Sequence, residues 1–166
     1  MGVETELQQV GGFTVNLTTT LAVSVSPNYS TGDVMGTKTE LANAGRLHRL
    51  VTARGIIQSV VIADHAEQKA NIDIIFFNAQ PVNGTYTDNA ALALHDDDSD
   101  MVIGVAQVAT WIDGGSGADI GWASNLGFAF DLGSANASIW MLAVARGAHN
   151  LGATDDIRVK IGLMVD

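Results

Sequence analysis

The chain has 166 residues, of which 47% are hydrophobic and 16% charged, and its formal net charge is -10. This composition is too apolar for a disordered chain, and the length fits one domain with a sizeable core. The negative charge argues against nucleic acid or an anionic membrane as the main partner, and the absence of cysteine excludes a disulfide framework and a thiolate metal site.

The first part of the chain is predicted to begin with a polar arm and to continue in strands. Residues 1–12 lack the basic and apolar regions of a signal peptide and are expected to form an N-terminal arm. Partly alternating apolar residues predict a long strand over 13–26, with a bulge near residues 18–20. A turn and two short strands are expected next, at 27–32, 33–36 and 37–44. Residues 46–54 are expected to form a loop or one helical turn.

Half of the eight basic residues lie in this part of the chain, at Lys38, Arg46, Arg49 and Arg54. Runs of charge are usually solvated faces, so we expect a loop whose basic groups balance nearby carboxylates. The alternative is a docking patch for an acidic partner.

The stretch 55–81 organises the rest of the chain, because it reads as two strands joined by a charged turn at 64–70. On the first strand, alternation predicts one face with Ile56, Val60 and Ile62 and the other with Ile57 and Val61. On the second strand, the two predicted faces are Ile72, Ile74 and Phe76, and Ile75 and Phe77. Both faces carry bulky apolar groups, so we expect both to be covered, by a second sheet or by another subunit.

The second half of the chain continues the same pattern of strands and turns. A loop is expected at 82–91, an exposed acidic corner at 95–100 and a flexible turn at 113–118. Four more strands are expected at 101–111, 126–132, 138–147 and 155–165. Eight or nine strands without a long helix predict an all-β fold, an antiparallel sandwich or barrel, in a single domain over 13–166.

The sequence HDDDSD at 95–100 is the strongest candidate for a metal site. Asp96, Asp98 and Asp100 are spaced like the first ligands of an EF-hand loop. However, Met101 replaces the glycine of the sharp turn, and Gln107 stands where a bidentate glutamate is needed. We therefore expect a solvated loop, with a calcium site of another type as the alternative.

Candidate catalytic groups are scattered. The four histidines form no His-x-His pair; they are His48, His65, His95 and His149. Ser116 lies in GGSGA, which resembles a nucleophile elbow except that Ala118 replaces the last glycine. The pairs Asp113 with Asp119 and Asp155 with Asp156 have the residue types of a glycosidase. The turn glycines Gly114, Gly115 and Gly117 are not followed by the lysine of a phosphate loop. We expect no catalytic set, no metal and no cofactor.

Three tryptophans are candidates for ligand stacking or protein contact. Trp111 and Trp122 flank the glycine-rich turn and could stack on a sugar, whereas Trp140 is expected in the core or at a subunit contact.

Several short motifs can be compared directly with those of known proteins. The sequence YSTGDVMG at 29–36 resembles the start of the small jelly-roll proteins on tailed-phage heads. The motifs that follow, in similar order, are VIAD at 61–64, IDIIFFNAQP at 72–81, TDNAA at 87–91, DSDMVIG at 98–104 and ATDDIRVKIGLM at 153–164. From about residue 13 onward the chain is similar to phage capsid decoration (cement) proteins.

This resemblance implies a jelly-roll β-sandwich and a virion structural protein without catalysis. Such a protein would be made in the host cytoplasm, form a homo-oligomer, typically a trimer, and bind the major capsid protein lattice on the exterior of the expanded head. The N-terminal arm would contact the capsid or a neighbouring subunit, and no site residue carries over. The same sandwich also builds carbohydrate-binding or receptor-binding virion modules, which are the alternative, and an enzyme on this fold is the least favoured hypothesis.

Overall fold

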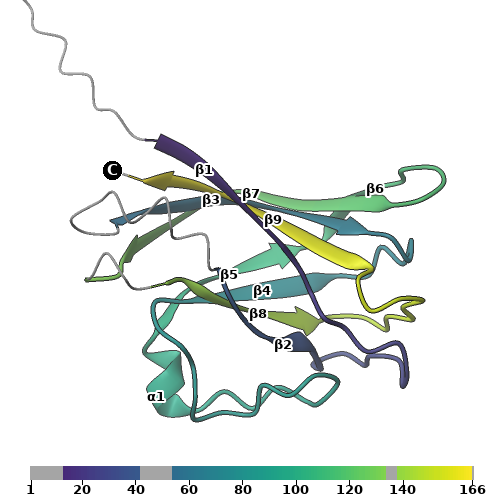
Figure 1. Cartoon of the computed structure of the whole chain (residues 1–166), viewed down its shortest axis with the longest axis horizontal. Helices are drawn as coiled ribbons and strands as arrows, with labels where there is room; N and C mark the ends of the chain where they lie inside the picture. Colours follow the sequence, from purple (N-terminus) through teal and green to yellow (C-terminus); the bar gives the residue numbers. More distant parts are fainter. Residues whose placement is uncertain (1–12, 42–53, 134–137, 166) are drawn as a thin grey trace, which may run out of the picture.

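The structure is a computed structural model that describes residues 13–41, 54–133 and 138–165. Within these ranges, nine strands form two antiparallel sheets that face each other, and one short helical turn, α1 (Asp96–Ser99), lies beyond the second sheet (Figure 1). Sheet I has the order β1 (Phe13–Thr20), β9 (Ile157–Val165), β3 (Arg54–Asp64), β7 (Asp119–Asp131) and β6 (Thr110–Ile112). Sheet II has the order β2 (Val34–Glu40), β8 (Trp140–Ala145), β4 (Ile72–Phe77) and β5 (Val102–Val108). The predicted antiparallel sandwich is therefore confirmed.

The connectivity is that of a jelly roll. The short β6 pairs only with β7, and the other eight strands divide equally between the sheets. The first, eighth, third and sixth of these strands lie side by side in sheet I, and the second, seventh, fourth and fifth in sheet II. Two facing four-stranded sheets of this kind are the jelly-roll solution to packing an all-β chain.

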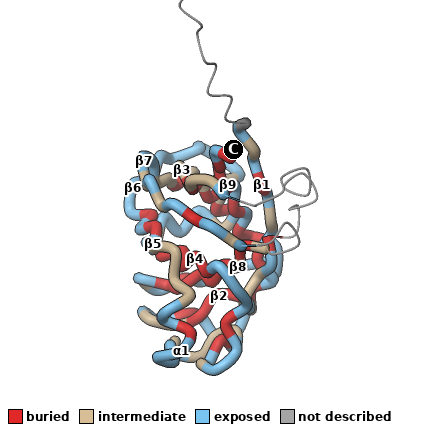
Figure 2. The backbone as a smooth tube through the Cα atoms, turned by 90° about the vertical axis from the view of Figure 1, so that its left-hand side faces the viewer, coloured by how far each residue is buried: buried red, intermediate tan, exposed pale blue. Residues whose placement is uncertain are grey.

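The main core lies between the sheets, where the tube of Figure 2 is red along both layers. β9 contributes Ile157, Val159, Ile161 and Leu163, as their alternation predicts, and all four are fully buried. β4 contributes Ile72, Ile74 and Phe76 from the facing sheet. In β9 these apolar residues recur at every second position, and the pleat directs them inward.

A bulge in β3 overturns one predicted face. Ile57 is fully buried together with Val60 and Ile62, whereas Ile56 is only partly buried. The pairing of β3 with both neighbours shifts between Ile57 and Ser59, so one extra residue, Gln58, interrupts the alternation. Strict period two therefore assigned Ile56 and Ile57 to the wrong faces.

The second face of β4 is also apolar, as predicted, but its cover comes from the same chain. Ile75 and Phe77 join Leu142 and Val144 of β8 in a second buried cluster. Tyr86, Leu92 and Met101 pack on this cluster from the segment that connects β4 to β5, residues 78–101, which we call the cover segment. Figure 1 shows the cover segment and α1 along the side of sheet II that faces away from sheet I. Neither a further sheet nor another subunit is needed on this face.

Other differences from the predicted strands are local. β1 ends at Thr20, although Leu21 and Val23 beyond it are buried and hydrogen-bonded to the start of β9 and the loop before it. The two short strands expected over 33–44 are one strand, β2, which is irregular between Met35 and Thr39. The expected strand 101–111 is two strands, because the chain changes sheets at Ala109.

The strand expected at 126–132 is part of the longer β7, which begins at Asp119. Asn125 and Gly127 have positive φ angles of 58° and 65° and form a bulge in its middle. This bulge hid the first half of the strand from a search for alternation. Phe128 and Phe130 do share the inner face, as predicted. The expected arm 1–12, the segment 42–53 with Arg46 and Arg49, and His48 lie outside the described residues.

Candidate functional site

Asp98 holds the cover segment in place. This carboxylate is fully buried at the end of α1, where the sequence had suggested an exposed acidic corner. It accepts hydrogen bonds from the backbone N–H groups of Val82, Asn83 and Gly84 at 2.7–3.2 Å and from the Tyr86 hydroxyl at 2.5 Å. The other acidic side chains of the corner, Asp96, Asp97 and Asp100, are exposed. The expected solvated loop is therefore confirmed for Asp96, Asp97 and Asp100 but is wrong for Asp98, which is buried.

The surroundings of Asp98 fix its charge. Burial by itself raises the pKa of a carboxyl, but the hydrogen bonds from Tyr86 and from the three backbone N–H groups outweigh it and hold the pKa of Asp98 well below its usual range. Burial and the bond to Asp98 raise the pKa of the Tyr86 hydroxyl to about 12. Asp98 is thus an anion that replaces solvent for the N–H groups of an irregular loop.

Asp88 joins two of the sequence motifs that we singled out separately. Its carboxylate accepts hydrogen bonds from the Tyr29 hydroxyl at 2.5 Å, the Gly36 N–H at 2.6 Å and the Ser24 hydroxyl. Burial and the bond to Asp88 raise the pKa of the Tyr29 hydroxyl to about 12. The motifs at 29–36 and 87–91 are therefore adjacent in space, and their shared task is to hold the start of β2 against the cover segment.

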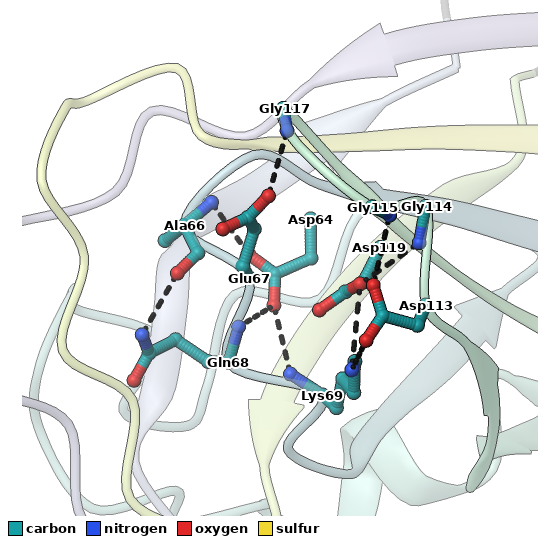
Figure 3. Close-up of polar contacts among 10 residues, drawn as sticks. All are labelled: Asp64, Ala66, Glu67, Gln68, Lys69, Asp113, Gly114, Gly115, Gly117 and Asp119. Carbon is teal, nitrogen blue, oxygen red and sulfur yellow. Dashed lines mark hydrogen bonds and ion pairs between the residues drawn. The ribbon is translucent and has the colours of Figure 1, made fainter.

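The turn glycines meet the turn between β3 and β4 at one end of the sandwich (Figure 3). The Lys69 ammonium lies 2.8 Å from Asp113 and 3.7 Å from Asp119. Its hydrogen bond raises the pKa of Lys69 and lowers the pKa of Asp113. The structure thus brings Asp113 and Asp119 together, as a glycosidase pair would be, but a lysine stands between them.

The other carboxylates of this cluster accept hydrogen bonds from backbone N–H groups. Asp64 is fully buried and accepts from the N–H groups of Ala66, Gln68 and Lys69 at 2.8–3.2 Å. Glu67 accepts from the N–H of Gly117 at 2.6 Å, which ties the two turns together (Figure 3). No group of three or more His, Cys, Asp or Glu side chains among the described residues is arranged to hold a metal ion.

The remaining candidates do not converge. His65 is exposed, and exposed His95 caps the N-terminus of α1. His149 is fully buried, which lowers its pKa, and its Nε2 has no hydrogen-bond partner in the described part of the chain. Ser116 is exposed in the turn. Asp156 accepts from the N–H groups of Gly152 and Ala153, whereas its neighbour Asp155 points to Arg158.

The tryptophans lie in three different places. Trp111 pairs with Gly121 and its ring lies over that glycine on the inner face of sheet I. Trp122 pairs with Thr110 on the outer face and lines a shallow groove beside β5. The expected common stacking platform of Trp111 and Trp122 is therefore wrong, because residues one position apart in register face opposite sides of a sheet. Trp140, at the start of β8, packs on the edge of the second cluster and lines a groove of its own.

The outer face of sheet I carries a set of apolar side chains that the described chain leaves at least partly open. Side chains of four strands contribute to it: Ile56, Val61, Ile112, Ile120, Trp122 and Met164. All six are partly or largely exposed, with Ile112 at 54% and Met164 at 45%. We call these residues the open face. The sequence analysis predicted Val61 on an apolar face that needs a cover, but the bulge at Gln58 led it to place Ile56 on the opposite face. It could not bring the side chains of β6, β7 and β9 together with them, because their pairing is long-range.

Comparisons with known proteins identified no relative of this chain. The chain matches no protein-family model, and the search of curated proteins finds no similar sequence. No helix in the described ranges has the length and hydrophobicity needed to cross a membrane.

Proposed function

We propose that the protein is a structural component of a phage virion, which decorates and stabilises the expanded capsid by binding the major capsid protein lattice. In this proposal the protein is a homo-oligomer, most simply a trimer, and has no catalytic activity. The observation that carries the proposal is the open face, because apolar side chains that gather on one exposed sheet face favour contact with another protein surface. Jelly rolls occur in viral capsid proteins as well as in lectins, so the fold agrees with this role without requiring it.

The charge on sheet I gives the open face a preferred partner. Three basic side chains lie on this side of the strands: Arg54, Arg158 and Lys160. Arg54 is paired with Asp131 and Arg158 with Asp155, which leaves Lys160 without an acidic partner among the described residues. The whole chain nevertheless has a formal net charge of -10. An apolar face with one unpaired lysine therefore complements an acidic and apolar surface on a second copy.

Contact between two unlike surfaces of identical chains repeats from copy to copy. Such head-to-tail contacts close into a ring when the rotation allows it, and a three-membered ring is the simplest assembly of this type with the symmetry of a local three-fold position.

The use of the carboxylates supports a structural role. Asp64, Asp88 and Asp98 each accept several hydrogen bonds from loops, and Lys69 stands between Asp113 and Asp119. The resemblance that first suggested a decoration protein also includes the motifs at 29–36 and 87–91, which meet at Asp88. These groups are committed to holding the sandwich and its loops together.

The proposal is tested with two matched double variants. Ile112→Ser with Met164→Ser removes two exposed apolar groups from the open face, and Val82→Ser with Val25→Ser removes two groups of similar exposure (60% and 42%) elsewhere. Light scattering should give three chain masses for the wild type and the control but one for the open-face variant. In co-sedimentation with expanded phage heads that lack decoration protein, the wild type and the control should pellet and the open-face variant should remain in solution.

A wild-type monomer that ignores the heads would contradict the proposal. Equal loss of assembly in both double variants would show that the open face has no special part in it.

A further inference from the structure

Beyond the proposed assembly, a second surface has the composition of a ligand site. It is a groove of about 440 Å³ between β2, the start of β8 and the cover segment. Its principal lining residues are Thr37, Lys38, Gln80, Tyr86, Thr87 and Trp140. The volume falls within the range of about 300–1,000 Å³ that is usual for small-molecule sites.

Two walls of this groove are held rigidly. The Tyr86 hydroxyl donates to buried Asp98, so the ring cannot turn away. The Lys38 ammonium donates to the carbonyl oxygen of Pro81 at 2.8 Å and lies 5.9 Å from the centre of the Tyr86 ring. Trp140 is paired with Phe77 and Glu40 and packs on the second cluster while part of its surface remains exposed. Such prior ordering reduces the entropy that a ligand loses on binding.

The remaining lining groups are polar and available. Thr37, Gln80 and Thr87 are exposed, and their side chains make no hydrogen bond within the described part of the chain. Two hydroxyls and one amide can both donate and accept, and Lys38 has further N–H groups to donate. The groove therefore combines one aromatic surface with several side chains that can exchange hydrogen bonds in both directions.

We propose that this groove binds a saccharide, with one pyranose ring stacked on the indole of Trp140 and its hydroxyls bonded to Gln80, Thr87 and Lys38. A sugar ring has an apolar C–H face and a rim of hydroxyls, each of which donates and accepts, and this matches the distribution of groups in the groove. A proline-rich peptide is a poorer match, because the hydroxyl of Tyr86, the one tyrosine in the groove, is already committed to Asp98.

The groove beside Trp122 provides a matched control. Its lining also contains a glutamine and a threonine, Gln107 and Thr110, but it lacks a second aromatic residue and a lysine. Equivalent substitutions in the two grooves therefore separate a specific site from a general effect of removing polar side chains.

Trp140 can serve as the reporter of binding. In a Trp111→Phe/Trp122→Phe background it is the one remaining tryptophan of the chain. Its fluorescence is titrated with glucose, galactose, mannose, rhamnose, N-acetylglucosamine and glucuronic acid up to about 50 mM, which covers dissociation constants in the millimolar range. Saturation-transfer NMR on the wild-type protein repeats the panel without substitutions.

At least one saccharide should change the Trp140 emission in a saturable way and receive saturation transfer. Gln80→Ala/Thr87→Val should weaken its binding at least tenfold, whereas Gln107→Ala/Thr110→Val should leave it unchanged. Both pairs are on the surface, so the circular dichroism spectrum should remain that of the wild type. The inference is overturned if no saccharide of the panel binds, if only a proline-rich peptide binds, or if the Gln107/Thr110 pair is the one that matters. It is independent of the proposed capsid role, because the open-face variants leave this groove intact.

Discussion

The outer faces of both sheets carry apolar residues at alternating positions, but the described chain covers them on sheet II and leaves them partly open on sheet I. On sheet II, Ile75 and Phe77 point away from the main core, and the cover segment buries them to 5% and 0% exposure. On sheet I, Val61 and Trp122 also point away from the main core, and the described chain leaves them partly open. Alternating apolar residues therefore show that a face needs a cover, but they do not show whether the chain itself or another molecule supplies it.

The difference lies in long-range hydrogen bonds. An irregular segment can cover a sheet only if its backbone N–H groups find partners, and Asp98 accepts from three of them. Asp88, which lies in the cover segment, accepts from the N–H of Gly36 and so ties the segment to β2. At the end of sheet I shown in Figure 3, the carboxylates of the turns, such as Asp64, are already used within the turns or between them. We expect the two faces to respond very differently to substitution.

The largest expected effect is that of Phe77→Ala. This ring is fully buried under the cover segment, so its removal should lower the free energy of unfolding by about 3–5 kcal/mol. Ile112→Ala on the open face should change it by less than about 1 kcal/mol, because the side chain is 54% exposed in the monomer. Urea unfolding of both variants, kept dilute enough to be monomeric, measures the contrast. Equal losses would mean that the open face is covered in the monomer as well.

Tyr86→Phe should have an intermediate effect that stays within the cover segment. The variant keeps the ring but removes the hydrogen bond to the charged Asp98, at a cost of about 1.5–3 kcal/mol. Hydrogen exchange should accelerate at the amides of Val82, Asn83 and Gly84, which share the same carboxylate. Tyr29→Phe is the matched control, because it removes the equivalent bond to Asp88 and should accelerate exchange at Ser24 and Gly36 instead. Unchanged exchange at residues 82–84 in Tyr86→Phe would contradict the role of Asp98.

The smallest expected effect is on the loss of folding stability that begins when the pH falls into the acid range. The pKa of Asp98 is lower in the folded chain than its ordinary value of 3.8, so the unfolded chain takes up the proton first as the pH falls. The contribution of Asp98 is therefore complete above about pH 3.8 and decreases as the pH falls below that value toward the folded pKa. Urea midpoints measured in this range should fall less steeply for Asp98→Asn than for the wild type, because the amide does not titrate. Equal slopes of urea midpoint against pH for the two proteins would show that protonation of Asp98 does not affect the stability of the cover segment.

Protonation of the buried His149 also lowers folding stability as the pH falls, but it does so at a higher pH than protonation of Asp98. Burial lowers the pKa of His149, so its contribution is complete above the unfolded value of 6.5 and is lost as the pH falls below it. Because His149 pairs through its backbone with Tyr29, this loss concerns the loops beside β2 and β8, outside the open face.

The sequence by itself determined the number and kind of most elements. Alternation in residues 72–77, 140–145 and 157–163 located β4, β8 and β9 and assigned both of their faces, since side-chain direction in a regular strand is a local property. The turn signals and the absence of a helical period were sufficient to predict an antiparallel sandwich.

Only the tertiary structure decided where alternation stops and what each polar residue does. The bulges at Gln58 and at Asn125 to Gly127 reverse faces, because they depend on how neighbouring strands pair. The roles of Asp88 and Asp98 were hidden because their partners lie up to 64 residues away in the chain. Trp111 and Trp122 are close in sequence but separated by the thickness of a sheet. Local chemistry fixes what a residue can do, and the long-range pairing of strands and loops selects which of these possibilities is realised.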